Sequence, residues 1–558
     1  MARKRSLVVV VVAVIVFAVA FLRAEQATNQ TPALRVTTRL VMLDVVATDK
    51  DGKPVTDLKQ DDFTIEDSGK KQKISIFGLE QPGGPAKTPA LPQYVYSNRP
   101  EYNMPSGALT VVVVDGLNSS FIEQARVRQV LLQFVAKQLT PGQQIAVYAL
   151  GLHLYRLQDF TSDPALLMAA ISGIQPKVPP NSPSTIAPLP VSEAGVATVR
   201  GYTPGQLQNV VNAFEAEQAV PNVDIRIHET LLAMRQLARI MGGHPGRKNL
   251  VWLTAGLPFS MIPDQNSITY AQTRAGTEHQ APVPHEISEA SFSNQLQQLT
   301  TEDVRRTAAL LADNQVAIYP VDARGLSVSD LSSSQFSMDE MSQQTGGKTF
   351  KNRNDIEHCV AQASADGSTY YSVGYYPEKK KFDGSFHKFK VSVNRPGIQL
   401  RYRPGYYALD LSKVNQKERE SELMTSLRDD TGPATMVVFD ARIAPPPPAE
   451  KAVLPIQFLV KPETITADDA KDGGKAINVD FFVAAFSKEG KPAGNNGTTA
   501  SATISADQYA QLRQKGLGMS VPITLAPGEY DLHLAVRDNH TGYLGTLTVP
   551  VTLKKPGA

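Results

Sequence analysis

The sequence of 558 residues contains a single cysteine, Cys359. One thiol cannot close an intrachain disulfide or supply a cysteine cluster for zinc, so disulfide scaffolds and thiolate metal sites are excluded. An excess of one charge is also missing, because 56 Lys and Arg residues face 54 Asp and Glu residues, for a net charge of +2. Binding to nucleic acid through phosphate neutralisation is therefore not expected.

Long apolar runs are lacking except near the N-terminus, where Arg3, Lys4 and Arg5 precede the sixteen residues from Leu7 to Leu22. A basic stretch before an apolar stretch is typical of a secretory signal. As a helix the run would span roughly 24 Å, short of a hydrocarbon core of ~30 Å. We expect residues 1–27 to form a signal peptide, with a retained anchor as the alternative. The protein is then secreted, periplasmic or in the cell envelope, and it contacts a membrane only if the segment is retained.

The length predicts three to four domains at about 150 residues per domain. Alternating apolar residues at Val41, Leu43 and Val45, followed by turn residues, predict a small β module over 33–80. Residues 81–107 are rich in Pro, Gly and Ser and predict a linker or a surface strap.

Strand and helix patterns alternate over 108–408. The apolar run Val111 to Val114 is typical of a parallel strand buried on both faces, and an amphipathic helix is expected at 121–138. This alternation predicts a doubly wound, Rossmann-like α/β domain. Two proline-rich, polar insertions, at 175–221 and 258–293, interrupt it and are longer than ordinary loops.

The C-terminal third shows strand patterns separated by Pro and Gly turns. Residues 409–434 are charged and predict a helical connector, and 435–553 predict an immunoglobulin-like β-sandwich. The predicted fold class is therefore α/β, with the α/β domain flanked by two β modules.

Several segments, taken as an ordered set over about 33–408, resemble one known family. They include VVVVDGLNSS, FTSD, RKNLVWLTAGLP and IYPVDARGL. This set resembles von Willebrand factor type A (VWA)-related proteins abundant in Acidobacteria. The resemblance implies a VWA-type sheet with flanking helices, a fold that usually serves as a protein-binding module.

The resemblance also implies a place for a metal ion, because VWA domains often bind Mg²⁺ through an Asp-x-Ser-x-Ser loop, a threonine and a second aspartate. Asp115 and Ser119 match the first and last loop positions, and Thr161 can fill the threonine position. Leu117 replaces the middle serine and Ala255 the second aspartate, so two of the five ligands are missing. The implied metal-dependent adhesion site is degenerate: it holds no cofactor, or it binds Mg²⁺ or Ca²⁺ weakly.

Enzyme motifs fail on inspection, and no catalytic or cofactor-binding residue is assigned. His228-Glu229 is followed by Leu232 where a zinc-protease helix needs a second histidine. Gly347-Lys348-Thr349 lacks the first glycine of a phosphate loop. The chain is therefore expected not to be an enzyme.

The expected function is that of an exported protein-interaction or cell-adhesion module whose partner is an unknown protein or an envelope polymer, and not nucleic acid. Two alternatives are open at the level of the sequence. One is an envelope hydrolase whose site is formed by the insertions at 175–221 and 258–293. The other is a structural spacer that has lost binding.

Overall fold

The fold is described from a computed structural model that covers part of the chain. The described residues are 41–555 except 81–89, 104–108, 141, 177–224, 245, 258–301, 327–331, 367, 378–383, 410–415, 428–431, 445 and 471–473. The predicted signal peptide at 1–27, the insertion at 258–293 and all but two residues of the insertion at 175–221 lie outside them.

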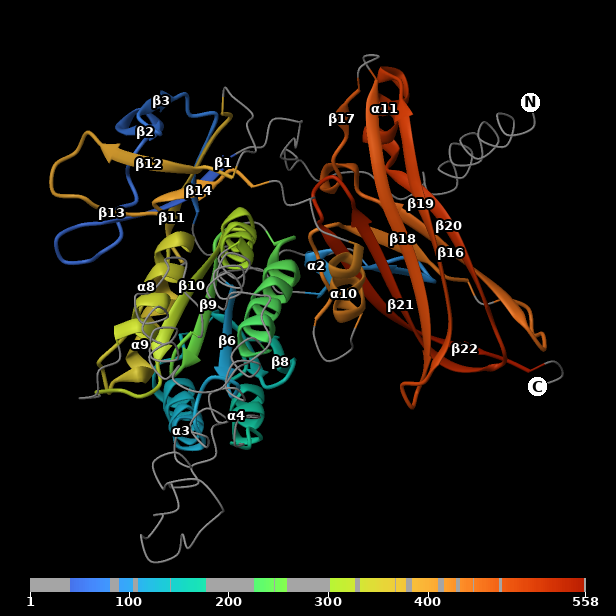
Figure 1. The fold of residues 1–558 in the computed structure, drawn as a ribbon, viewed down its shortest axis with the longest axis horizontal. Helices are drawn as coiled ribbons and strands as arrows, with labels where there is room; N and C mark the ends of the chain where they lie inside the picture. The colour runs from blue at the N-terminus through green and yellow to red at the C-terminus, as the bar shows by residue number, and fades with distance from the viewer. Residues whose placement is uncertain are drawn as a thin grey trace, which may run out of the picture.

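A five-stranded sheet forms the centre of the α/β unit, in the order β10-β9-β6-β7-β8 (Figure 1). Four of its strands are parallel, and only the edge strand β8 runs antiparallel to its neighbour. The chain starts at the central strand, moves to one side and then crosses to the other, which is the doubly wound order. This confirms the predicted α/β class. The strands are β6 (Leu109–Asp115), β7 (Gln144–Leu150), β8 (Leu154–Thr161), β9 (Lys248–Thr254) and β10 (Val316–Asp322).

Helices cover both faces of this sheet because its central strands are apolar on both sides. Val111 and Val113 belong to one buried cluster, with helix 225–241 and helix 302–313, whereas Val112 and Val114 belong to a second cluster on the opposite face. The other helices are α2 (Pro100–Asn103), α3 (Phe121–Lys137), α4 (Pro164–Ser172), α8 (Ser332–Thr345), α9 (Ile356–Asp366), α10 (Gln416–Ser426) and α11 (Ala506–Lys515), with short 3-10 turns at Gln60–Asp62 and Pro462–Thr464. None of the helices within the described residues is long and apolar enough to cross a membrane.

The N-terminal β unit differs from the predicted module at 33–80. Its strands pair with strands from 370–407, which the sequence pattern placed in the α/β domain. The early strands have few neighbours of their own, and their apolar residues become buried only when Tyr371 and Val373 pack against Leu43 and Ile65. The strands are β1 (Val41–Thr48), β2 (Phe63–Asp67), β3 (Lys70–Gln72), β4 (Ile76–Glu80), β11 (Tyr370–Tyr375), β12 (Phe386–Val393), β13 (Gln399–Arg401) and β14 (Gly405–Tyr407).

Two antiparallel sheets form the C-terminal unit. One has the order β20-β16-β15-β5 and the other β17-β18-β21-β22, with β19 paired to β18. Strand β5 lies inside the predicted linker 81–107, which is therefore not only a linker: it supplies an edge strand that pairs with β15. The strands are β5 (Val95–Ser97), β15 (Phe439–Arg442), β16 (Ala452–Val460), β17 (Asp468–Asp469), β18 (Lys475–Ser487), β19 (Pro492–Ile504), β20 (Leu517–Leu525), β21 (Gly528–Asp538) and β22 (Leu544–Leu553).

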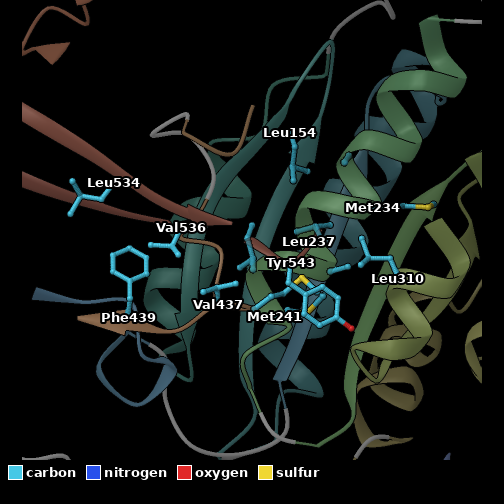
Figure 2. Packing of buried hydrophobic residues seen from close by; sticks show 14 of the residues in the cluster. Leu154, Met234, Leu237, Met241, Leu310, Val437, Phe439, Leu534, Val536 and Tyr543 are labelled. Carbon is cyan, nitrogen blue, oxygen red and sulfur yellow. The ribbon is translucent and has the colours of Figure 1, made fainter. Parts of the chain in front are cut away.

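The α/β unit and the C-terminal unit share one hydrophobic cluster (Figure 2). Met241 of helix 225–241 lies in it together with Val437, Phe439 and Val536 of the C-terminal unit. Polar contacts cross the same junction through α10, which occupies part of the predicted connector 409–434. The two units are therefore packed against each other and not merely tethered.

Three charged side chains are buried at this junction. The Glu422 carboxylate of α10 lies 2.7 Å from Nη2 of Arg239 on helix 225–241 and 3.4 Å from Nη1 of Arg537 on β21. Burial acts to raise the pKa of Glu422, but the charges of Arg239 and Arg537 outweigh it, so the pKa lies below its ordinary value. The carboxylate therefore links the α/β unit to the sandwich in its charged form.

Candidate functional site

Asp115 ends the central strand β6 at the carboxyl edge of the parallel sheet, where ligands bind in doubly wound folds. Its side chain is fully buried. Oδ1 accepts hydrogen bonds from the backbone nitrogens of Leu117 (3.1 Å) and Asn118 (2.9 Å), and Oδ2 accepts one from Nε1 of Trp252 (2.9 Å). The amide Nδ2 of Asn118 lies within hydrogen-bond distance of both oxygens (3.2 and 2.9 Å).

The pKa of Asp115 is raised because burial disfavours its charged form, and the hydrogen bonds from Asn118 and Trp252 act in the opposite direction. The groups in contact with the carboxylate are hydrogen-bond donors of the protein: the nitrogens named above and the side chain of Thr254. The side chain therefore serves as an internal acceptor that fixes the loop after β6 onto strand β9.

Asn118 extends this network to helix 225–241. Its Nδ2 donates to Oγ1 of Thr230 (2.9 Å), and its Oδ1 accepts from Nε of Arg226 (3.0 Å). Burial lowers the pKa of Arg226, and the nearby Asp115 opposes that shift. Arg226 and Thr230 were not among the site residues expected from the sequence. Apolar residues at helical spacing, Ile227 and Leu231, indicate a helix here but do not show which way it faces.

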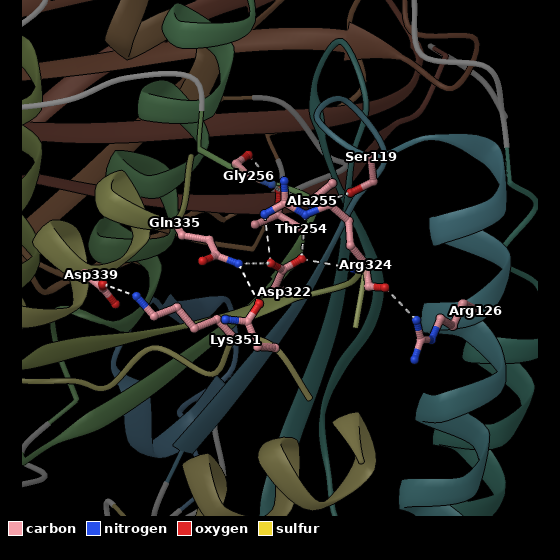
Figure 3. Close-up of polar contacts among 11 residues, drawn as sticks. Ser119, Arg126, Thr254, Ala255, Gly256, Asp322, Arg324, Gln335, Asp339 and Lys351 are labelled. Atoms are coloured by element: carbon pink, nitrogen blue, oxygen red, sulfur yellow. Dashed lines mark hydrogen bonds and ion pairs between the residues drawn. The ribbon is translucent and has the colours of Figure 1, made fainter. Parts of the chain in front are cut away.

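Ser119 lies where the sequence placed it, in the buried loop after β6. Its Oγ accepts a hydrogen bond from the backbone nitrogen of Ala255, at 3.0 Å, and so joins this loop to the end of β9 (Figure 3). Asp115 and Ser119 thus both hold the loop after β6 against strand β9, and each is engaged by donors of the protein.

Thr161 is not part of this site, so its predicted role as a ligand is wrong. Asp115 pairs with Leu150 at one end of β7, whereas Thr161 pairs with Ile145 near the other end. At about 3.3 Å per residue, the offset of five positions from Leu150 to Ile145 places Thr161 roughly 17 Å further down the sheet. Strand β8 is antiparallel and carries the chain back to the opposite edge. There Oγ1 of Thr161 accepts a hydrogen bond from the Asp163 nitrogen (3.0 Å) at the start of α4.

The arrangement around Asp115 does not fit a divalent cation. Mg²⁺ and Ca²⁺ require several oxygen ligands, but nitrogen donors face the carboxylate and Ser119 Oγ accepts from the backbone. Thr161 is remote, and no group of three His, Cys, Asp or Glu side chains within the described residues could hold a metal ion. No step of the function is therefore assigned to a metal here.

A second carboxylate at the same edge is also engaged internally (Figure 3). Asp322 ends β10 and accepts hydrogen bonds from Nε and Nη2 of Arg324, both at 2.8 Å, and from Nε2 of Gln335 at 3.1 Å. Arg126 of α3 donates to the Arg324 carbonyl oxygen at 2.8 Å. This network holds the loop after β10 against the start of α8 and against α3.

Large apolar side chains are exposed at this edge of the sheet. They lie at the start of α3, in the turn after β7, in the first described turn of helix 225–241 and in the loop after β10. We name this set the edge patch: Phe121 (52% exposed), Ile122 (79%), Leu152 (46%), Ile225 (42%) and Leu326 (66%).

A pocket of ≈ 160 Å³ lies beside the edge patch. It contains the His228-Glu229 pair, which fails as a zinc-protease motif, together with His153 from the turn after β7. Nδ1 of His153 lies 4.0 Å from Oε2 of Glu229. The lining residues are His153, Leu154, His228, Glu229, Leu232, Ala233, Gln236 and Thr425.

No protein-family model and no curated protein matches the chain. Similar solved structures are VWA-like. They include the vWF domain of the type V pili tip protein Mfa5 from Porphyromonas gingivalis (12% identity, 46% of this chain and 94% of that chain, TM-score 0.27) and BatB from Bacteroides thetaiotaomicron (8%, 46% and 98%, 0.21). The three N-terminal domains of Mfa5 match 86% of this chain and 77% of that chain, at 10% identity and a TM-score of 0.25. These values are too low to transfer a function or a binding site.

Proposed function

We propose that this protein is an exported, non-enzymatic interaction module that binds a partner protein through the carboxyl edge of its parallel sheet, without a metal ion. The edge patch carries this proposal. Its five large apolar side chains come from four segments of the chain and stand exposed where the parallel strands end. Exposed apolar groups gathered on one surface favour binding to a protein over solvation by water.

The polar residues of the same edge support binding without a bridging cation. Asp115, Ser119 and Asp322 are held by donors of the protein itself, so none of them needs an external ion. The partner then gains affinity from burial of the apolar side chains of the edge patch. A protein partner fits this surface better than an envelope polymer, because the edge patch offers apolar area instead of a row of polar groups.

The experiment compares charged substitutions inside and outside the edge patch. The mature protein and the variants Ile122→Asp and Leu326→Asp are used to capture partners from envelope extract, with and without chelator. Val453→Asp is the control, since Val453 is also exposed (57%) but lies on β16 of the sandwich. The captured protein is then purified and its Kd is measured for each variant.

We expect both edge variants to weaken the Kd at least tenfold, while the control and the chelator leave it unchanged. All variants should keep the stability of the parent within about 0.5 kcal/mol, because the substituted side chains are exposed. Loss of the partner on chelation, or equal binding by the edge variants, would show the proposal to be wrong.

A further inference from the structure

The pocket beside the edge patch is the right size for one amino-acid side chain. Its volume of ≈ 160 Å³ is close to that of an engineered cavity, about 150 Å³, that holds one benzene molecule. Pockets for drug-sized ligands and cofactors are larger, about 300–1,000 Å³. A nucleotide or a sugar chain does not fit, so the occupant is a single group carried by a larger partner.

The polar groups in the pocket indicate the charge of that group. Glu229 is the carboxylate among the lining residues, and no lysine or arginine lines the pocket. His153 Nδ1, at 4.0 Å, is too far from the carboxylate for a hydrogen bond. Nε2 of Gln236 donates a hydrogen bond to the Thr425 carbonyl oxygen (3.4 Å). The amide oxygen of Gln236 is a second hydrogen-bond acceptor beside the Glu229 carboxylate. The pocket therefore offers hydrogen-bond acceptors to a ligand group that donates hydrogen bonds.

Apolar side chains complete the lining. Leu154 and Ala233 are buried, and Leu232 lies beside Ala233 on helix 225–241. Such a surface suits the methylene stem of a long basic side chain, which packs on apolar groups while its charged end reaches polar ones. The imidazoles of His153 and His228 add flat faces on which a guanidinium can stack.

The surroundings of the pocket match the anatomy of a binding hot spot. Exposed apolar residues adjoin the lining residues in the chain: Leu152 precedes His153, Ile225 lies in the same turn region as His228, and Met424 of α10 precedes Thr425. Hot spots commonly consist of an anchor side chain surrounded by apolar contacts that exclude water, and arginine is enriched among such anchors.

We propose that this pocket receives an arginine side chain of the partner protein, paired with the Glu229 carboxylate. The inference rests on the proposed function, because it assigns a specific anchor to the partner that the edge patch binds. Arginine is favoured over lysine, since a planar guanidinium can pair with a carboxylate through two hydrogen bonds and also stack on the imidazoles. The occupant is thus an apolar protein segment that presents one arginine.

The test uses a small probe instead of the unidentified partner. Nα-acetyl-arginine methylamide is added to the mature full-length protein, and the Cε1–H resonances of ¹³C-labelled histidines are followed by NMR. His153→Gln and His228→Gln assign the two signals. The citrulline analogue is the matched control probe, because it has the shape of arginine without its charge, and the lysine analogue tests the preference for a guanidinium.

We expect the arginine probe to shift both histidine signals, the lysine probe to bind more weakly and the citrulline probe to leave the signals unchanged. Glu229→Gln should weaken binding of the arginine probe at least tenfold. Glu123→Gln, a carboxamide substitution on α3 at the same edge but outside the pocket, should bind like the parent. Equal binding of citrulline and arginine, no shift with arginine, or an unchanged Glu229→Gln would overturn the inference.

Two readouts separate this inference from the proposed function. If Ile122→Asp abolishes partner binding while the arginine probe does not bind, the pocket assignment alone is wrong. If the arginine probe binds in a Glu229-dependent way while edge variants retain the partner, the proposed function alone is wrong. Glu229→Lys provides a further check, in which partner binding is measured. The introduced lysine ammonium should compete with the partner's arginine for the pocket and weaken the Kd.

Discussion

Nε1 of Trp252 donates a hydrogen bond of 2.9 Å to Oδ2 of Asp115, and both side chains are fully buried. The bond joins two neighbouring parallel strands at the sheet edge. The carboxylate that the family resemblance assigns to a cation is thereby used to hold the one tryptophan of the chain. Trp252 is in turn a fluorescent reporter placed directly at the candidate site.

The first prediction concerns the stability of this network. Asp115→Ala removes the acceptor of the Trp252 indole and of the backbone nitrogens of Leu117 and Asn118. Each buried donor left without an acceptor costs about 1–3 kcal/mol. We expect the free energy of unfolding to fall by at least ~2 kcal/mol in urea denaturation followed by Trp252 fluorescence. Asp115→Asn, which keeps one acceptor oxygen, should lose less. An Asp115→Ala variant as stable as the parent would contradict the structural role.

The second prediction concerns metal ions. Because nitrogen donors surround Asp115 and Thr161 is remote, any affinity for Mg²⁺ or Ca²⁺ should be about 10⁻⁴ M or poorer. Titration calorimetry of the metal-free protein, with Trp252 fluorescence alongside, measures this. Micromolar affinity that Asp115→Ala abolishes would show that the loop rearranges to bind the ion.

The third prediction concerns the pH dependence of the junction formed by Glu422. Since its pKa in the folded protein lies below its ordinary value, the charged carboxylate stabilises the fold above about pH 4.3, the usual glutamate pKa. That contribution is lost as the pH falls through the lower, folded-state pKa. Glu422→Gln should be destabilised at neutral pH because Arg239 and Arg537 lose their partner.

The measurement is urea denaturation of the parent and of Glu422→Gln between pH 3 and pH 7. The difference in stability should be constant above about pH 5 and should shrink as the pH falls below the usual glutamate pKa of about 4.3. A difference that does not change with pH would mean that the carboxylate is not charged at the junction.

The fourth prediction tests how closely the two units approach. A Cβ atom at Gly243, just after helix 225–241, would lie 2.2 Å from the Thr435 carbonyl oxygen. Gly243→Ala must therefore push the sandwich away from the helix, and overpacking of this kind costs about 1–3 kcal/mol. Gly518→Ala is the control, because the nearest atom to its Cβ would be 4.0 Å away. Calorimetry should show a lower Tm for Gly243→Ala alone. Equal Tm values would mean that the junction is loose.

The fifth prediction concerns export. Mass spectrometry of the mature protein should find its N-terminus between Ala20 and Gln30, because a basic stretch followed by an apolar stretch is typical of a secretory signal. Recovery of intact Met1 in the membrane fraction would instead indicate a retained anchor. Intact Met1 on a cytosolic protein would exclude export.

Local patterns predicted the α/β unit well, because each of its strands and helices carries its own periodicity. The run from Val111 to Val114 forms a buried parallel strand, and the helix expected at 121–138 spans Phe121–Lys137. Strand β8 was not predicted, since it lies at the sheet edge and only one of its residues is fully buried.

Long-range pairing could not be predicted from such patterns. Strand β5 has three residues and no periodicity to distinguish it from a linker, and its place is fixed by β15 and by the side chain of Asn98, which bonds to the carbonyl oxygens of Ala434 and Val437. Thr161 was misplaced for a related reason. A match to a motif position in the sequence does not reveal at which edge of the sheet the residue lies.

The pairing of early strands with late ones sets the order in which the protein can fold as it is synthesised. Val41 pairs with Tyr375, and Val95 pairs with Arg442, so strands β1 and β5 leave the ribosome long before their partners exist. The sheet from β6 to β10 is complete by Asp322, so it can form while strands β1 and β5 are still unpaired. Unpaired strands held open in this way fold slowly and aggregate readily. We therefore expect folding of this protein to depend on a chaperone that covers its first hundred residues until the last ones are synthesised.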